Sequence, residues 1–302
     1  MKKIVAIIFI CLLSFCTSKN ENKPAQTDSP EEGTINISVD ETFKPAIEEE
    51  LKVYKSEYPN ANIIVNYKSE ADCFKDLLKD SARLIIVSRG LTNNESEYFN
   101  SKLSFYPQYG LLAYDAIAAI VNINNNDSVF TLNDLENILS GKEKYTAILD
   151  GTNATSTVKY LQDSILKGKP FGANVVAVNG SDAVIEAIKK TPNAIGFVGN
   201  SWVSNGYDTK QLQNLKQMKL ALIECKGCEE KGYFAKASQA TLMYGQYPLA
   251  RPLYFIVKEK WLGLGTGFTN FLSFERGQLI FRRSNLVPAK MNFNKRQSKI
   301  KE

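Results

Sequence analysis

Apolar and polar positions follow a strand and helix order that repeats along most of the chain. Strands are predicted where short runs of β-branched and other apolar residues occur, at residues 35–39, 62–67, 83–88, 114–122, 174–178, 194–198, 220–225 and 252–258. Helices are predicted where apolar residues recur every three or four positions, at residues 47–58, 71–80, 131–141, 158–165, 181–190 and 268–281. This order predicts an α/β fold with a largely parallel sheet.

Two of the predicted strands divide the pattern into two blocks. The strands at 114–122 and 252–258 each stand between groups of elements large enough to form an ordinary domain. We therefore expect two α/β lobes between which the chain crosses twice. The first lobe is expected to contain residues 34–113 and 252–302, and the second residues 114–251.

The N-terminus has the pattern of an export signal. Two lysines precede an apolar run that is short for a membrane span, so residues 1–15 are predicted to be a signal peptide. Cys16 follows Leu-Ser-Phe, which resembles a bacterial lipobox and predicts lipidation of Cys16. Residues 16–33 are polar and are expected to form a flexible tether. The expected location is the cell envelope, on a membrane-anchored lipoprotein that faces the periplasm or the outside; an uncleaved membrane anchor is the alternative.

The charge of the chain gives little support to a polyanionic partner. The full sequence carries +5, and loss of Lys2 and Lys3 with the signal peptide leaves 5 − 2 = +3. No dense basic stripe occurs, so we expect no binding to nucleic acid. Residues 295–302 are basic and are interpreted as a solvated tail.

The composition argues against an enzyme. The chain contains no histidine, which excludes a Ser-His-Asp or Cys-His apparatus. It has no Walker A loop, and the glycines at 263, 265 and 267 have the spacing GxGxG rather than that of a dinucleotide site. We interpret residues 261–267 as a turn that leads into the last helix, and we expect no cofactor and no metal.

The cysteines suggest one local pair. Cys225 and Cys228 form a CxxC motif, which suits a short-range disulfide, a redox centre or half of a zinc site. A zinc site would lack its other usual ligands here. In an exported protein a disulfide or two idle thiols are the simpler interpretations.

One helix start carries an unusual number of hydrogen-bond donors. The sequence GTNATSTVKYLQDSIL begins at residue 151 with small, hydroxylic and amide residues. A helix N-terminus leaves backbone N–H groups without partners and favours an anion. Ser156 and Thr157 could add hydroxyl donors, and Asn153 would leave the approach open. Alternatively, Thr155 or Ser156 only caps the helix.

Similar polar residues follow other predicted strands, at Asp40, Glu41, Thr42, Ser69, Ser88 and Arg89. Ligands of open α/β sheets collect at the carboxyl ends of strands, so these loops are candidates to converge with residues 153–157 on one oxyanion.

Four segments carry a resemblance to a known family. These are YGQYPLARPLYF (244–255), AVIEAIKKTPNAIGFVG (183–199), IVSRGLTNNE (86–95) and FLSFERGQLIFRRSNLVP (271–288). In their order along the chain they resemble the phosphate-binding members of the periplasmic solute-binding proteins that feed ABC importers. The resemblance extends from about residue 34 to 290. It implies a two-lobed periplasmic-binding-protein fold of type II whose lobes close on an oxyanion.

The resemblance also implies roles for single residues. Thr42 matches the threonine of the family's first loop, Ser69 the serine of its second, and Thr157 the threonine of its third. Asp40 and Glu41 stand where small hydroxylic residues are usual. Gly151 stands where an arginine is common.

Two arginines could supply a positive charge in place of the missing one. Arg89 could pair with the anion or, equally, form a structural ion pair. Arg251 lies in the segment that resembles the interlobe crossing, where positioning the hinge is the expected role. Asp40 could accept a hydrogen bond from a protonated phosphate and so reject sulfate, or could only cap the first helix.

We therefore expect a monomeric solute-binding lipoprotein that captures phosphate, or a related oxyanion such as sulfate or molybdate, for an ABC permease. A ligand sensor with the same fold is one alternative. A redox or scaffold protein that uses the CxxC motif is another.

Overall fold

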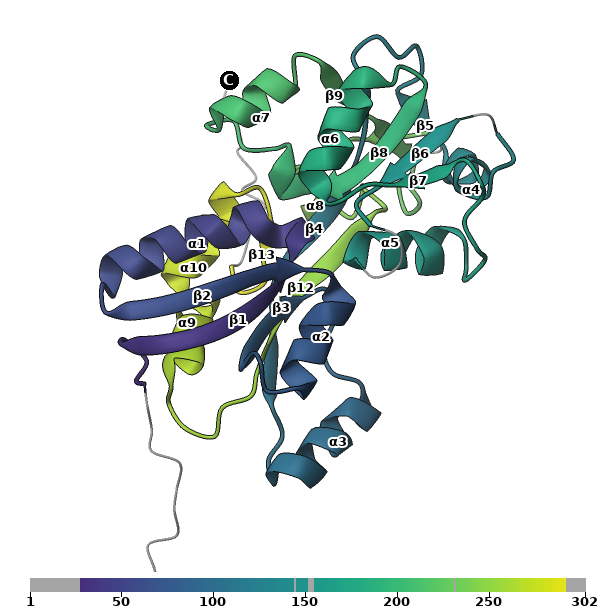
Figure 1. Ribbon diagram of the computed structural model, residues 1–302. Helices are drawn as coiled ribbons and strands as arrows, with labels where there is room; N and C mark the ends of the chain where they lie inside the picture. The colour runs from purple at the N-terminus through teal and green to yellow at the C-terminus, as the bar shows by residue number, and fades with distance from the viewer. Residues whose placement is uncertain (1–27, 144, 152–154, 231, 292–302) are drawn as a thin grey trace, which may run out of the picture.

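The computed structural model describes residues 28–291 except 144, 152–154 and 231 (Figure 1). The predicted signal peptide, Cys16, Asn153 and residues 295–302 lie outside the described residues.

The strands are β1 Gly33–Asp40, β2 Ala61–Lys68, β3 Leu84–Val87, β4 Gln108–Asn122, β5 Val129–Phe130, β6 Thr146–Leu149, β7 Val175–Ala177, β8 Ala194–Gly199, β9 Met218–Leu220, β10 Leu222–Glu224, β11 Phe234–Ala235, β12 Ala250–Val257 and β13 Val287–Pro288. The α-helices are α1 Lys44–Glu57, α2 Glu70–Leu78, α3 Asn93–Leu103, α4 Leu132–Leu139, α5 Ser156–Tyr160, α6 Ser181–Lys190, α7 Thr209–Asn214, α8 Gln239–Met243, α9 Leu264–Ser273 and α10 Glu275–Arg283. Short helical turns are η1 Glu41–Phe43, η2 Leu161–Ile165 and η3 Asn200–Trp202. The η2 segment is a π-helix that continues α5.

Two long antiparallel strands join the halves of the molecule. The main sheet has the strand order β2-β1-β3-β12-β4-β8-β6-β7, with β9 and β13 also paired to β4. β1, β2 and β3 are parallel, as are β6, β7 and β8. Between these parallel groups, β12 and β4 pair antiparallel with each other and run from one half to the other (Figure 1).

The hydrophobic side chains form a separate core in each half. One core contains Ile37, Phe43 and Ala113 and closes against α9. The other contains Ala116 and Leu249 and fills the space around β8 and α6. The division falls within β4 and β12, so these strands form the two crossings between the lobes. The predicted α/β fold of two lobes with two crossings between them is confirmed. Below, the first lobe is the one built on β1 to β3, and the second the one built on β6 to β8.

Two predicted elements are interrupted. The strand predicted at 220–225 is two strands, because the chain leaves β4 after β9 and pairs with β5 and β11 as β10. The helix predicted at 268–281 is two helices, since Phe274 adopts an extended backbone between α9 and α10. A side chain on Gly277 would meet the carbonyl oxygen of Phe271 at 2.5 Å, so this glycine permits the close approach of the two helices.

The end of the predicted tether is part of the first lobe. Asp28 is buried, forms an ion pair with Arg83 and accepts a hydrogen bond from the Leu264 N–H, 2.8 Å away. A Cβ atom on Gly267 would meet the Pro30 carbonyl oxygen at 2.2 Å, so α9 needs glycine there. Residues 28–33 therefore pack on the lobe. The prediction of a flexible tether over residues 16–33 is wrong for these six residues. The same contacts place the second and third glycines of the GxGxG sequence inside α9 rather than in a turn before it.

Two further features concern the envelope and the cysteines. Across residues 28–291, leaving aside the five positions not described, no helix has both the length and the apolar character needed to cross a membrane. Cys225 and Cys228 form a disulfide after β10, and Cys73 is a free thiol on the buried face of α2.

Candidate functional site

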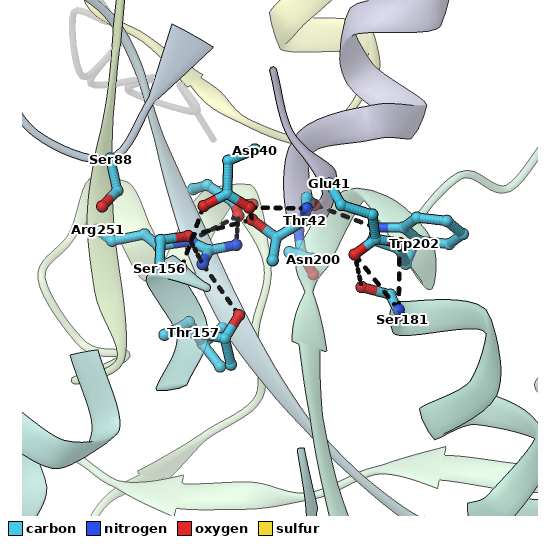
Figure 2. Close-up of polar contacts among 12 residues, drawn as sticks. Asp40, Glu41, Thr42, Ser88, Ser156, Thr157, Ser181, Asn200, Trp202 and Arg251 are labelled. Carbon is cyan, nitrogen blue, oxygen red and sulfur yellow. Dashed lines mark hydrogen bonds and ion pairs between the residues drawn. The ribbon is translucent and has the colours of Figure 1, made fainter. Parts of the chain in front are cut away.

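Residues from both lobes meet at the crossing strands (Figure 2). Asp40 ends β1 in the first lobe and Thr42 follows it in η1, whereas Ser156 is the first residue of α5 in the second lobe. The hydroxyls of Thr42 and Ser156 lie 3.2 Å apart. All three residues are buried. The structure thus joins candidates from loops that are more than 110 residues apart in sequence.

Three donors converge on the Asp40 carboxylate. It accepts hydrogen bonds from the Thr42 N–H at 3.0 Å, from the Thr42 hydroxyl at 2.8 Å and from the Ser156 N–H at 3.1 Å. Asp40 is fully buried and caps η1. Donors from the starts of two helical segments therefore surround a single oxyanion, which is the environment that stabilises a buried negative charge.

Arg251 supplies a buried positive charge to this site. Its guanidinium donates from Nη1 to the hydroxyls of Ser156, at 2.8 Å, and Thr157, at 3.1 Å. From Nε and Nη2 it donates to Asp115 Oδ2 at 3.2 and 2.9 Å. The guanidinium also lies 4.5 Å from the centre of the Phe43 ring. Arg251 is 1% exposed, and it has the contacts expected of a hinge residue together with contacts to the candidate oxyanion loop.

The pairing of β12 with β4 explains why Arg251 reaches this place. Arg251 and Asp115 are direct partners across the antiparallel ladder, so their side chains share one face of the sheet. Burial raises the pKa of the Asp115 carboxyl, and the adjacent Arg251 opposes that shift. The pair is thus fixed by strand register, in the crossing that joins the lobes.

The start of α5 is held by a second buried acid. Thr155 caps the helix by accepting a hydrogen bond from the Val158 N–H at 3.2 Å. Its hydroxyl donates to Asp150 Oδ1 at 2.7 Å. Burial, with a smaller contribution from the charge of Asp40, raises the pKa of Asp150 to about 6. This fixed cap orients Ser156 and Thr157 toward Arg251.

Glu41 forms a second contact between the lobes. Its carboxylate accepts hydrogen bonds from the Ser181 N–H and hydroxyl, each at 3.1 Å, at the start of α6. Nearby, the Trp202 indole N–H donates to the Thr42 carbonyl oxygen at 3.0 Å. Burial raises the pKa of Glu41 to about 7 despite the hydrogen bonds from Ser181. The two lobes are therefore in direct contact on this side of the crossing strands.

Two other predicted site residues, Ser69 and Ser88, form hydrogen bonds within the first lobe. Ser69 caps α2 by accepting from the Asp72 N–H at 3.2 Å. Ser88 donates its N–H, at 2.7 Å, and its hydroxyl, at 2.5 Å, to Glu70 Oε2. Burial raises the pKa of Glu70, and the charge of Asp40 adds to this effect. These serines thus lie near the site with carboxylate partners of their own.

Arg89 does not contact Ser156 or Thr157. It forms a two-pronged ion pair with Glu95, with nitrogen to oxygen distances of 2.8 and 2.9 Å, and its guanidinium lies 3.8 Å from the centre of the Phe74 ring. The sequence allowed Arg89 either to bind the anion or to form a structural ion pair, and the structure shows the ion pair. The cation at the oxyanion loop is Arg251 instead.

Sequence reasoning named Asp40 but missed two other carboxylates around the site, those of Asp115 and Asp150. Three fully or almost fully buried acids, Asp40, Asp115 and Asp150, lie around the one arginine, Arg251, that contacts Ser156 and Thr157. Asp115 and Asp150 follow no recognisable spacing, and only the pairing of distant strands and loops reveals them. The formal charges of these four residues sum to −3 + 1 = −2, so the site opposes a fully ionised anion, whereas an anion that brings a proton could donate it to a carboxylate.

Comparisons with known proteins agree with this architecture. A model of the PBP superfamily domain, PBP_like_2, matches residues 24–275. The phosphate-binding protein PstS of Pseudomonas aeruginosa is 25% identical over 228 residues, which are 68% of this chain and 66% of that relative, slightly less than two thirds of its length. PstS of Staphylococcus saprophyticus is 22% identical over 284 residues, which cover 89% of this chain and 85% of that protein.

Solved structures share the fold. A candidate phosphate ABC transporter substrate-binding protein from Clostridium perfringens, with bound phosphate, superposes with a TM-score of 0.70 at 21% identity, covering 85% of this chain and 100% of that chain. An ABC-type phosphate transport receptor from Vibrio cholerae gives a TM-score of 0.60 at 16% identity, over 85% of this chain and 100% of that one. The relatives are named as binding proteins and not as enzymes. With a family match over most of its length and two lobes joined by β4 and β12, the chain belongs to the PBP superfamily.

Proposed function

We propose that this chain is an extracytoplasmic solute-binding protein that captures inorganic phosphate and delivers it to an ABC permease. The observation that carries the proposal is the buried contact of the Arg251 guanidinium with the hydroxyls of Ser156 and Thr157, between the lobes. The phosphate-binding names of the relatives support the same ligand.

Phosphate would engage donors that both lobes bring together around Asp40 and Arg251. The Ser156 N–H, the hydroxyls of Ser156 and Thr157, and the Thr42 hydroxyl are its donors, and Arg251 balances its charge. Asp40 would exchange its present donors for the proton of a phosphate monoanion or dianion. Sulfate carries no proton near neutral pH, so its oxygen would face the Asp40 oxygen with no hydrogen between them.

The contacts are sufficient in number for useful affinity. Micromolar binding requires about 8 kcal/mol, and a hydrogen bond to a charged group contributes about 1.5–3 kcal/mol before the cost of association. Four or more such donors in a buried site reach this range, whereas a single helix start would not.

The anchoring proposal is separate from the ligand. We propose that the signal peptide 1–15 is removed, that Cys16 is lipidated, and that the protein acts as a monomer in the cell envelope. The lipobox-like sequence before Cys16 supports this. Metabolic labelling with a fatty acid should mark the full chain and leave a Cys16→Ser variant unmarked; equal labelling of both would refute lipidation at Cys16.

Calorimetric titration tests the ligand. The chain from Thr17 onward keeps every described residue, and it would be titrated with phosphate and with sulfate at pH 6 and pH 8. We expect saturable phosphate binding, tighter at pH 6, and no sulfate binding. Ser156→Ala should weaken phosphate binding by about tenfold or more, because a donor to the anion is lost. Ser101→Ala, on the exposed face of α3, is the matched control and should bind like the parent.

Asp40 decides between phosphate and the other oxyanions. An Asp40→Asn variant presents an N–H donor where the carboxylate stood, so it should gain sulfate or molybdate binding. If the parent chain binds sulfate or molybdate as tightly as phosphate, the ligand is another oxyanion and the role of Asp40 is refuted. If no oxyanion binds to the folded chain, the phosphate proposal fails.

A further inference from the structure

A groove remains between the lobes on the side away from Glu41. Its volume is about 500 Å³, which lies within the range of about 300–1,000 Å³ typical of small-molecule sites. Helix α2 of the first lobe faces helix α5 and the π-helical turn η2 of the second across it (Figure 1). The groove is lined by Glu70, Ala71, Phe74, Lys75, Leu78, Arg89, Lys159, Gln162 and Asp163.

Closure of the lobes does not remove this space. The lobes already touch through the hydrogen bond from Ser156 to Asp40 and through the contact of Ser181 with Glu41. Inorganic phosphate needs only the buried donors at those contacts. A ligand limited to phosphate would therefore leave the groove to solvent, whereas a larger ligand could fill it while the lobes stay in contact.

The groove has a prepared floor and charged walls. Arg89 is held flat on the Phe74 ring, 3.8 Å from its centre, by the ion pair with Glu95. On the opposite wall Lys159 is exposed, and Gln162 lies one turn further along the helical segment. The lining contains the cations Lys75, Arg89 and Lys159 and the carboxylates of Glu70 and Asp163. Lys75 pairs with Asp72 and Arg89 with Glu95, so Lys159 is the cation of the lining that an acidic ligand group can engage without breaking a described ion pair.

The groove adjoins the proposed phosphate site through both lobes. In the first lobe, Glu70 lines the groove and binds Ser88, and it is close enough to Asp40 for that charge to act on it. In the second lobe, Lys159 stands three residues after Ser156 on the same helix. Ser156 is buried and does not itself line the groove, so a molecule whose phosphoryl group contacts Ser156 would have to extend along α5 to reach Lys159.

We propose that the ligand class includes small phosphate monoesters with an acidic or polar substituent, which lies in the groove between α2 and α5. The phosphoryl group binds Ser156, Thr157 and Arg251, so this inference rests on the phosphoryl site of the proposed function. Lys159 receives the acidic end of the substituent, and Gln162 offers an amide to its hydroxyl groups. No bond is broken, since the ester is bound and not hydrolysed.

Calorimetric titration of the chain from Thr17 onward tests the groove. The probes are inorganic phosphate, glycerol 3-phosphate, 3-phosphoglycerate and, as the control without phosphorus, glycerate. We expect 3-phosphoglycerate to bind about tenfold tighter than phosphate, and glycerate not to bind. Lys159→Ala should remove most of this advantage, and Ala71→Phe, which fills the groove, should weaken both esters. Neither change should alter phosphate affinity.

The matched control is Lys190→Ala, which removes an exposed lysine of the same lobe outside the groove and should change nothing. Phosphate binding with weaker or no ester binding overturns the groove and leaves the proposed function standing. An ester advantage that survives both Lys159→Ala and Ala71→Phe also overturns it. Ester binding without phosphate binding supports the groove and refutes inorganic phosphate as the ligand. Binding of neither, to a folded chain, refutes both.

Discussion

Replacing Arg251 by methionine should destabilise the protein strongly. Arg251 is 1% exposed and its partner Asp115 is 0% exposed, so the substitution leaves a carboxylate in the apolar crossing without its cation. Removing one partner of a buried ion pair costs about 3–5 kcal/mol. The hydroxyls of Ser156 and Thr157 lose their charged donor at the same time. We expect the free energy of unfolding to fall by about 4 kcal/mol at pH 7.5.

The loss should depend on pH in a defined direction. Without Arg251, burial is opposed only by the backbone hydrogen bonds from Ala116 and Asn200, so the pKa of Asp115 in the folded variant lies further above the unfolded value than in the parent. A carboxyl with a raised folded pKa is more stable in the fold when protonated, so the penalty grows as pH rises. Each pKa unit corresponds to about 1.4 kcal/mol. The penalty should therefore shrink between pH 7.5 and pH 5.5, by at most about 1.4 kcal/mol for each pH unit.

Urea denaturation of matched variants measures these differences. Arg89→Met is the control, because it removes the same group from a partly exposed ion pair and should cost about 1 kcal/mol or less. Asp115→Leu in addition to Arg251→Met should restore part of the stability, since no unpaired charge remains. If Arg251→Met costs no more than Arg89→Met, or if its cost is the same at both pH values, the buried pair does not have the role described here.

Three other perturbations test separate parts of the structure. Glu41 has a folded pKa of about 7, raised by burial from 4.5, so its favourable contribution is complete below pH 4.5 and is lost as pH rises through 7. In the parent chain this loss should lower the free energy of unfolding by about 3 kcal/mol between pH 4.5 and pH 8. Glu41→Gln should reduce that decrease, as measured by urea denaturation. An unchanged dependence of the unfolding free energy on pH would contradict this. Replacing Cys225 and Cys228 by serine should cost at most about 2 kcal/mol, because the closed loop is short, and should leave phosphate titrations unchanged; lost binding would favour the redox alternative. Gly267→Ala should destabilise the chain and speed proteolysis before β1, because its Cβ displaces Pro30; unchanged cleavage would show that residues 28–33 are not held there.

The sequence determined the elements whose signals are local. The apolar rhythm of residues 181–190 predicted α6 at its observed bounds, and the hydroxyl of Thr131 marked the start of α4, where it forms a capping box with Asp134. The donor-rich start of α5 was visible too, because capping residues precede the helix they serve. Periodicity and capping depend on neighbours within a few positions, and these are printed in the sequence.

The local sequence pattern did not predict the bounds of a strand or helix where contacts with a distant part of the chain interrupt it. Residues 220–225 have the composition of one strand, yet the chain divides at Ala221 because its two ends pair with different sheets. Residues 268–281 have the rhythm of one helix, yet Phe274 is extended where α9 turns into α10. Both interruptions follow from which surfaces lie nearby, and periodicity carries no such information.

The charges of the site were decided by tertiary structure alone. Arg251 stands 95 residues after Ser156 and reaches it because the register of β12 on β4 sets Arg251 opposite Asp115. Arg89 follows a strand end, as a ligand residue should, yet Glu95, six residues further along the chain at the start of α3, holds it in an ion pair. An ion pair depends on which groups the folded chain brings within about 4 Å of each other, at a burial that determines how strongly they interact. The sequence shows that such groups exist, and only the packing of the two lobes selects which of them meet.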